Sequence, residues 1–273
     1  MFEQERVRTR GVAAVNSLEL IYHSIVREVR KSHGNALIGL MMSMMQAVMF
    51  VAAFYLMFSI LGLRGMAIRG DFLVYIMSGI FLFLTHIKTM GAVIGSEGPA
   101  SPMMKHAPMN TIIAISGAAL AQLYLQTLSM FVIMFAYHMI IEPIHIDRPI
   151  PSYGMFLVAW FTGMAVGIVF LAMKPWAPAA VGIMSSIYSR ANMIASGKMF
   201  VANQLPPFML SLFDWNPLFH AIDQARGFAF INYTPRNSAI DYPIYVALTL
   251  IMLGLMLEFY TRKHASESWG ARA

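Results

Sequence analysis

Side chains that could carry out chemistry are few in this sequence, and none is spaced as an active site requires. A loop that binds nucleotide phosphates has a glycine five residues before its Gly-Lys pair, and residues 195–198 (Ala-Ser-Gly-Lys) lack it. No His-Glu-x-x-His motif occurs, and the histidines are too scattered to pair as metal ligands within one helix: His23, His33, His86, His106, His138, His145, His220 and His264. We therefore expect no catalytic residue, no metal and no cofactor in this chain.

The composition places the chain in a membrane. Of its 273 residues, 58% are hydrophobic and 12% are charged, whereas soluble domains carry about 25% charged residues. The net charge of +6 comes from residues between apolar runs rather than from one basic stripe, so we expect contact with membrane lipids and not with nucleic acid. The chain has no cysteine, which excludes disulfides.

Six apolar runs have the length of membrane-spanning helices. They cover residues 36–61, 72–94, 111–141, 153–173, 179–200 and 242–260. The sequence therefore predicts an all-α integral membrane protein with six transmembrane helices. Residues 202–241 are too polar for a simple span, but their two short apolar stretches, 205–213 and 218–230, predict re-entrant periplasmic helices.

The N-terminal segment has a different pattern. Apolar residues recur at helical spacing over residues 15–29, with charged residues on the other side, which predicts an amphipathic helix in the membrane interface. A helix packed on a soluble partner is the alternative. We divide the chain into a cytoplasmic N-terminus (1–35), a transmembrane domain (36–260) and a cytoplasmic tail (261–273).

Charge distribution orients the predicted spans. Six spans put both termini on one side, and that side carries twelve Lys and Arg residues against five on the other. Because cytoplasmic loops are enriched in Lys and Arg, we expect both termini in the cytoplasm. No Asp or Glu lies in the middle of a predicted span, which argues against coupling to a proton or sodium gradient.

One string of residues resembles a known family. Ser196-Gly197 and Leu205-Pro206 precede Trp215-Asn-Pro-Leu-Phe-His220, and Arg226 follows. Together with the amphipathic N-terminus and the proline-rich break after the second span, this resembles the permease subunit of ABC-2-type transporters, in the branch that exports polysaccharides. The similarity covers nearly the whole chain.

The resemblance implies a function and partners. It implies a homodimer in the bacterial inner membrane, whose two protomers enclose a channel for a lipid-linked polysaccharide of the capsule or O-antigen type. ATP and Mg²⁺ would bind a separate ABC ATPase subunit, and periplasmic or outer-membrane export proteins could continue the route. The alternatives are an ABC-2 exporter of a drug or lipid, and a membrane assembly protein that transports nothing.

The resemblance also assigns two groups of residues. The break at residues 95–110 would couple the permease to the ATPase through Glu97, Pro99, Pro102, Lys105 and His106. This break lacks the family's usual basic and aromatic residues, and an ordinary solvated loop is the alternative. Residues 202–241 would shape the periplasmic gate through Pro206, Pro207, Trp215, Asn216, Pro217, His220 and Arg226. Trp215 and His220 could instead be interfacial anchors.

Arg190 is the sharpest single candidate for substrate contact. A guanidinium inside a span should face a pore or an acidic partner, and it binds carboxylates and phosphates in a bidentate manner. Structural pairing with Asp214 or with backbone carbonyls is the alternative. Tyr124, Trp160 and Tyr188 could stack on sugar rings in the channel, or could be packing residues.

Overall fold

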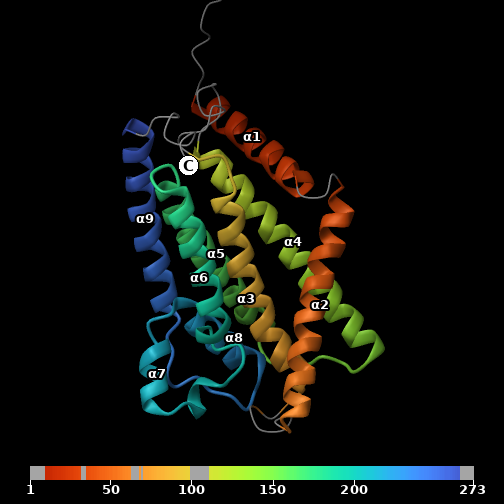
Figure 1. Cartoon of the computed structure of the whole chain (residues 1–273). Helices are drawn as coiled ribbons and strands as arrows, with labels where there is room; N and C mark the ends of the chain where they lie inside the picture. The colour runs from red at the N-terminus through yellow and green to blue at the C-terminus, as the bar shows by residue number, and fades with distance from the viewer. Residues whose placement is uncertain (1–9, 32–34, 63–67, 69, 99–110, 265–273) are drawn as a thin grey trace, which may run out of the picture.

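The computed structural model describes residues 10–31, 35–62, 68, 70–98 and 111–264, and over these ranges the chain is helical without a β-strand. The long helices are followed in Figure 1 by colour, from red to blue. In chain order they are α1 (Arg10–Lys31), α2 (Ala36–Ile60), α3 (Phe72–Ile94), α4 (Thr111–Ile140), α5 (Pro149–Met173), α6 (Pro178–Ala195) and α9 (Asp241–His264). Between α6 and α9 lie the 3₁₀ turn η2 (Ala202–Gln204) and the short helices α7 (Pro207–Phe213) and α8 (Pro217–Ala229).

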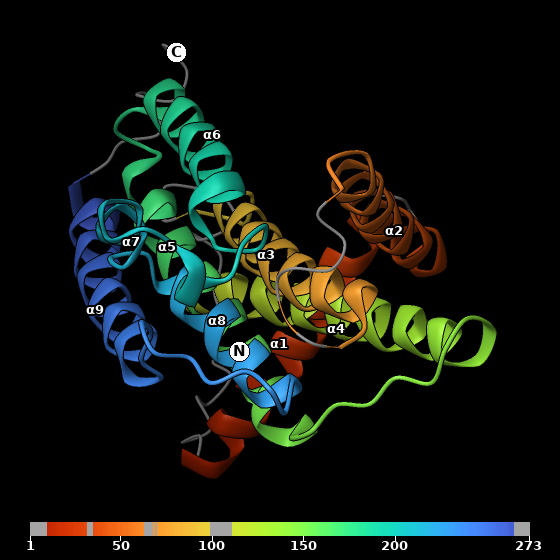
Figure 2. The ribbon, with the colours of Figure 1, turned by 90° about the horizontal axis from the view of Figure 1, so that it is seen from below.

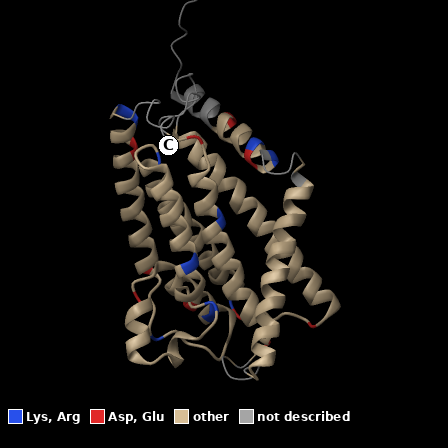
Figure 3. Cartoon of the chain, viewed as in Figure 1, with Lys and Arg blue, Asp and Glu red and all other residues tan. Residues whose placement is uncertain are grey.

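The chain is a multi-pass helical membrane protein. Five of the described helices are long and apolar enough to cross a bilayer: α2, α3, α4, α5 and α9. Charged residues are sparse along the bundle, and most of them lie toward its two ends (Figure 3). The sixth predicted span corresponds to α6, which ends at Ala195 instead of residue 200 and is too polar to meet the same criterion.

The bundle is built around α3 and α5. About 72% of the apolar window of α3 and 61% of that of α5 are buried, against 28% for α2 and 22% for α9. α5 packs on α3, α8 and α9, while α4 packs on α1 and α3. Viewed from below, α2 stands to one side, with α3 between it and α6 (Figure 2). α1 and the C-terminal end of α9 lie at the same end of the bundle, which is at the top of Figure 1.

Two glycines of α5 allow α3 to approach closely. A Cβ atom on Gly163 would lie 2.4 Å from the carbonyl oxygen of His86, and one on Gly167 would lie 2.8 Å from Cβ of Val93. Real Cβ atoms do not approach other atoms so closely, so only glycine fits at these two positions unless the helices separate. The Gly-x-x-x-Gly spacing is therefore a helix contact in this fold.

The start of α5 differs from the prediction. The apolar pattern predicts a span that begins at residue 153, but α5 begins at Pro149. Proline suits the first turn of a helix, whose N–H groups have no intrahelical partner and whose φ it already adopts. The residues just before it are fixed to α8, because the N–H groups of Asp147 and Arg148 donate to the carbonyls of Ala229 and Phe228.

The N-terminal amphipathic pattern forms α1, which lies across one end of α4. Ser24 and Val29 are buried there, and a Cβ atom on Gly117 of α4 would collide with the Ser24 side chain. Leu18 and Tyr22 are exposed on another side of α1. One face of α1 therefore packs against the bundle, and a second face, which carries Leu18 and Tyr22, is exposed.

Candidate functional site

A groove runs along the bundle between α2 and the neighbouring helices. Its volume is about 790 Å³, and its α2 wall extends from Gly39 to Met57, which is about 27 Å at 1.5 Å per residue. The opposite wall comes from α3, α4 and α6 through Lys88, Ala92, Gln122, Leu125 and Met193. The groove is mostly apolar because methionine and phenylalanine side chains of α2 dominate its surface: Met42, Met45, Met49, Phe50, Phe54 and Met57.

The polar side chains of the groove are few. Lys88 of α3 is half-buried and forms no ion pair with a described residue. Gln46, Gln122 and Ser43 add neutral polar atoms. The Ser43 hydroxyl accepts a hydrogen bond from Nε2 of Gln126 at 2.9 Å, so α2 is tied to α4 beside the groove.

Arg190 lies on a polar face of α6 that adjoins this groove. Helical spacing puts Gly182, Ser186, Ser189 and Arg190 on the same side of α6 as Met193, which lines the groove. Arg190 is exposed in the single chain and makes no ion pair with any described residue, so the expected alternative of pairing with Asp214 does not occur. The arrangement leaves a guanidinium available to something outside the protomer.

Tyr188 points the other way, into the bundle. Its hydroxyl donates to Nε2 of His86 (2.9 Å), a fully buried side chain of α3. The Thr162 hydroxyl donates to the Ala159 carbonyl, so Nδ1–H of His86 donates to Thr162 Oγ1 at 3.0 Å. The hydrogen bonds of His86 join α3, α5 and α6. Tyr188 thus has its polar group engaged inside the protein.

Asn216 connects α6 to α8. Its Oδ1 accepts from the N–H of Leu218 and caps α8, while its Nδ2 donates to Oδ1 of Asn192 (2.9 Å) and to the carbonyl of Ala195 (3.0 Å). Pro217 occupies the first position of α8. Pro206 precedes α7 and Pro207 begins it. The prolines of the predicted gate therefore begin short helices, as their chemistry favours.

Arg226 fixes the turn between α6 and η2. Its side chain is 1% exposed. Nη1 donates to the carbonyls of Gly197 (2.8 Å) and Phe200 (2.7 Å), and Nη2 donates to that of Lys198 (2.7 Å). The guanidinium also lies 4.2 Å from the ring centroid of Tyr75. With these contacts made inside the chain, Arg226 is built as a structural anchor of the region predicted to form the gate.

Lys198 is buried at the same turn. Its Nζ donates to the carbonyl of Met193 (2.8 Å) and lies 3.6 Å from the ring centroid of Phe83 and 5.3 Å from that of Phe54. Because Met193 and Phe54 both line the groove, this lysine lies directly behind one end of it.

His220 and Asp223 bind the loop that precedes α9. Nδ1 of His220 accepts from the N–H of Ala239 (2.9 Å), so Nε2 carries the proton and donates to the carbonyl of Asp214. Asp223 accepts hydrogen bonds from the hydroxyls of Tyr233 and Ser238. Burial and the Asp223 carboxylate raise the pKa of Tyr233 well above its usual value.

Three aromatic candidates have distinct environments. Trp215 is 62% exposed, and its carbonyl accepts from the Tyr242 hydroxyl (2.7 Å). Tyr124 is 56% exposed on α4 and does not line the groove. Trp160 is half-buried, and its Nε1 donates to the carbonyl of Ala119 (2.8 Å), which joins α5 to α4. Only Trp215 and Tyr124 of this group thus present much ring surface outside the protomer.

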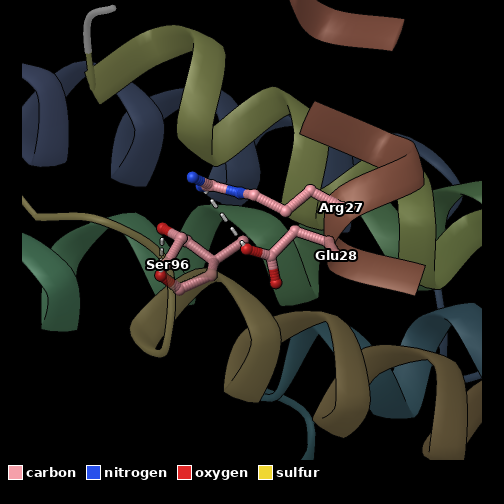
Figure 4. A network of polar contacts seen from close by, with 4 residues as sticks. Arg27, Glu28 and Ser96 are labelled. Carbon is pink, nitrogen blue, oxygen red and sulfur yellow. Dashed lines mark hydrogen bonds and ion pairs between the residues drawn. The ribbon is translucent and has the colours of Figure 1, made fainter. Parts of the chain in front are cut away.

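The predicted coupling region begins at the end of the bundle where α1 lies. Arg27 and Glu28 of α1 lie beside Ser96, which follows α3 (Figure 4), and the Arg27 and Glu28 charged groups are 3.9 Å apart. The Ser96 hydroxyl donates to the Val93 carbonyl (2.7 Å). Glu97, which follows Ser96 in the chain, is half-buried. Pro99, Pro102, Lys105 and His106 lie outside the described residues.

Three charged side chains inside the bundle are not among the residues that the sequence predicts for the site. Lys88 is half-buried in α3, and Lys198 is buried in the turn after α6. Glu258 is buried in the last third of α9, and its Oε1 has no hydrogen-bond partner among the described residues. Charged residues inside apolar runs could have directed attention to Lys88 and Glu258. Burial of Lys198 depends on a turn that packs against α3, which hydropathy does not report.

A second groove, of about 670 Å³, lies between α3, α4, α5 and α8. It has no Lys, Arg, Asp or Glu in its lining. Over the described ranges, no three His, Asp or Glu side chains converge as metal ligands would. The α2 groove therefore combines the stronger features of a binding site, namely size, an unpaired cation and an adjoining polar helix face.

Comparison with models of protein families and with curated proteins finds no match to this chain.

Proposed function

We propose that this chain is the membrane-spanning permease subunit of an ABC-2-type exporter that moves a lipid-linked polysaccharide out of the cytoplasm. Two copies would enclose the channel, and a separate ABC ATPase subunit would supply the energy. The resemblance of the string from Ser196-Gly197 to Arg226 motivates the family, and the polar face of α6 beside the groove supports a channel between protomers.

The single observation that carries a channel is the exposure of Arg190. α6 directs Tyr188 and Asn192 into the bundle, and its outer side is exposed. On that outer side helical spacing puts Arg190 between Ser186 and the two isoleucines Ile183 and Ile187. An unpaired guanidinium in hydrocarbon is costly, so the side that carries Arg190 needs water or protein against it. A second copy that closes over α6 and the α2 groove would provide both.

This arrangement makes α6 the sixth span. Its polar residues lower its hydropathy, but a helix shielded by a partner copy does not need the hydropathy of one surrounded by lipid. Six spans then return the chain to its starting side, and the Lys and Arg bias supports a cytoplasmic location for that side. The resemblance implies that the membrane is a bacterial inner membrane. Periplasmic or outer-membrane proteins would receive the polysaccharide.

The end of the bundle that holds α1 would then dock the ATPase. Arg27, Glu28 and Glu97 place charges of both signs beside the start of the predicted coupling segment at residues 95–110. A cytoplasmic segment that fits a groove of the ATPase can pass its movement to α3 and α4, because it joins these two helices.

Export of a lipid or a drug is the second candidate. The apolar lining of the groove favours it, since five methionines and two phenylalanines contact whatever occupies that space. Binding of an apolar molecule requires no sugar-binding aromatics. The two candidates differ in what accumulates in the cell when the subunit is removed.

Deletion of the gene in its native host tests the proposal. We expect the lipid-linked polysaccharide to accumulate inside the cell, and expect the intact gene to restore export. Co-purification in mild detergent should recover an ATPase subunit together with the permease. An Arg190→Ala variant should assemble with that ATPase but restore export poorly, whereas Arg236→Ala, which changes an exposed arginine outside α6, should restore it fully. Normal surface polysaccharide in the deletion strain would remove the proposal.

A further inference from the structure

The α2 groove contains an unsatisfied positive charge. Lys88 is half-buried in the wall of α3, and no described Asp or Glu pairs with it. It lies six residues before the end of α3 at Ile94, which is about 9 Å along the helix axis. A lysine at this depth requires an anionic partner or access to water.

The rest of the groove fits a hydrocarbon chain. Below Lys88 the α2 wall continues to Met57, with Met45, Met49 and Ala53 exposed along it. Methionine side chains are unbranched and flexible, so they adapt to an irregular apolar chain. The groove therefore has a long apolar surface and one cation toward the end of the bundle that holds α1. An anionic lipid complements both features, because it has a hydrocarbon chain and a negatively charged headgroup.

We propose that this groove binds a single-chain lipid phosphate, with the phosphate on Lys88 and Gln122 and the hydrocarbon chain along the methionines of α2. The inference rests on the proposed function in one respect, since such a lipid would be the carrier end of the exported polysaccharide. Lys88 lies in the half of α3 nearer the end of the bundle that holds α1, so the phosphate would belong to a lipid of the leaflet on that side.

Farnesyl phosphate is a suitable probe because it has a short prenyl chain and one phosphate. Titration into the full-length chain in detergent, followed by native mass spectrometry, should show one bound molecule per chain. Lys88→Gln should weaken binding on the order of tenfold to a hundredfold, as loss of a charged hydrogen bond does. Lys88→Arg should retain binding, because the charge remains. Lys174→Gln is the matched control, since Lys174 is an exposed lysine whose Nζ donates to the carbonyl of Ile94.

Two further arms separate the headgroup from the chain. Farnesol and inorganic phosphate should each bind far more weakly than farnesyl phosphate, because each lacks one of the two contacts. Ala53→Trp, which fills the apolar part of the groove without changing a charge, should also weaken binding, and it tests the site if Lys88→Gln fails to fold. Equal binding by the wild type and Lys88→Gln, or by farnesol and farnesyl phosphate, would overturn the inference.

Failure of this inference is distinguishable from failure of the proposed function. If farnesyl phosphate binds through Lys88 but deletion of the gene leaves polysaccharide export intact, the lipid site stands and the export proposal falls. If deletion abolishes export but Lys88→Gln and Ala53→Trp bind farnesyl phosphate normally, the lipid site falls and the export proposal stands.

Discussion

At the scale of single residues, the positive charges of this chain have three different roles that their sequence context does not separate. Arg226 is buried on backbone carbonyls, Lys198 is buried against aromatic rings, and Arg190 is exposed on α6. The sequence singled out Arg190 because it interrupts an apolar run. It could not assign Arg226, because its carbonyl partners lie 26 to 29 residues away and are brought near only by the fold.

Replacement of Arg226 should destabilise the protein. Arg226→Gln removes three charged hydrogen bonds and leaves buried carbonyls of the turn after α6 without donors. We expect a loss of at least about 3 kcal/mol, measured as a lower midpoint of thermal unfolding in detergent. Arg236→Gln, at an exposed arginine of the same region, should unfold like the wild type. Equal midpoints for the two variants would contradict a structural role for Arg226.

At the scale of helices, hydropathy located the spans well and their ends less well. α2, α3 and α4 agree with the predicted runs to within one residue at each end, because continuous apolar sequence leaves few alternatives. α5 begins earlier than expected because Pro149 starts a helix as readily as it ends one. α6 ends earlier because Gly197, with φ of +76°, lies in a left-handed turn that helical periodicity does not reveal.

Close packing of α3 on α5 should depend on Gly163 and not on every glycine of α5. A methyl group at Gly163 would meet the backbone of His86 at 2.4 Å, whereas one at Gly154 would meet nothing within 4 Å. Gly163→Ala should therefore cost about 1–3 kcal/mol through forced separation of the helices. Gly154→Ala should be neutral or slightly stabilising, because alanine favours helix. The test compares the two midpoints in thermal unfolding, and a stable Gly163→Ala variant would refute the contact.

At the scale of the whole molecule, the sequence indicated a membrane bundle but not which helix faces would remain uncovered. Hydropathy treats α2 and α3 alike, although α3 is mostly buried in the bundle and α2 stands aside beside a groove. That difference depends on which helices pack together, and packing follows from side-chain shapes along whole faces. The groove and the polar side of α6 therefore became visible only in three dimensions.

Association of two copies through α6 is the last expectation, and the absence of cysteine makes it directly measurable. Ser186 is exposed on α6, and Met252 is exposed on α9. Viewed from below, α6 and α9 lie at different places around the bundle (Figure 2). A single Ser186→Cys substitution should allow oxidation to link two chains in native membranes, because a closed channel brings the two α6 faces near each other. Met252→Cys should remain monomeric under the same oxidant, since its surface faces lipid in this arrangement. Efficient linkage through Met252→Cys together with none through Ser186→Cys would place the contact between copies on α9 and remove α6 from the channel wall.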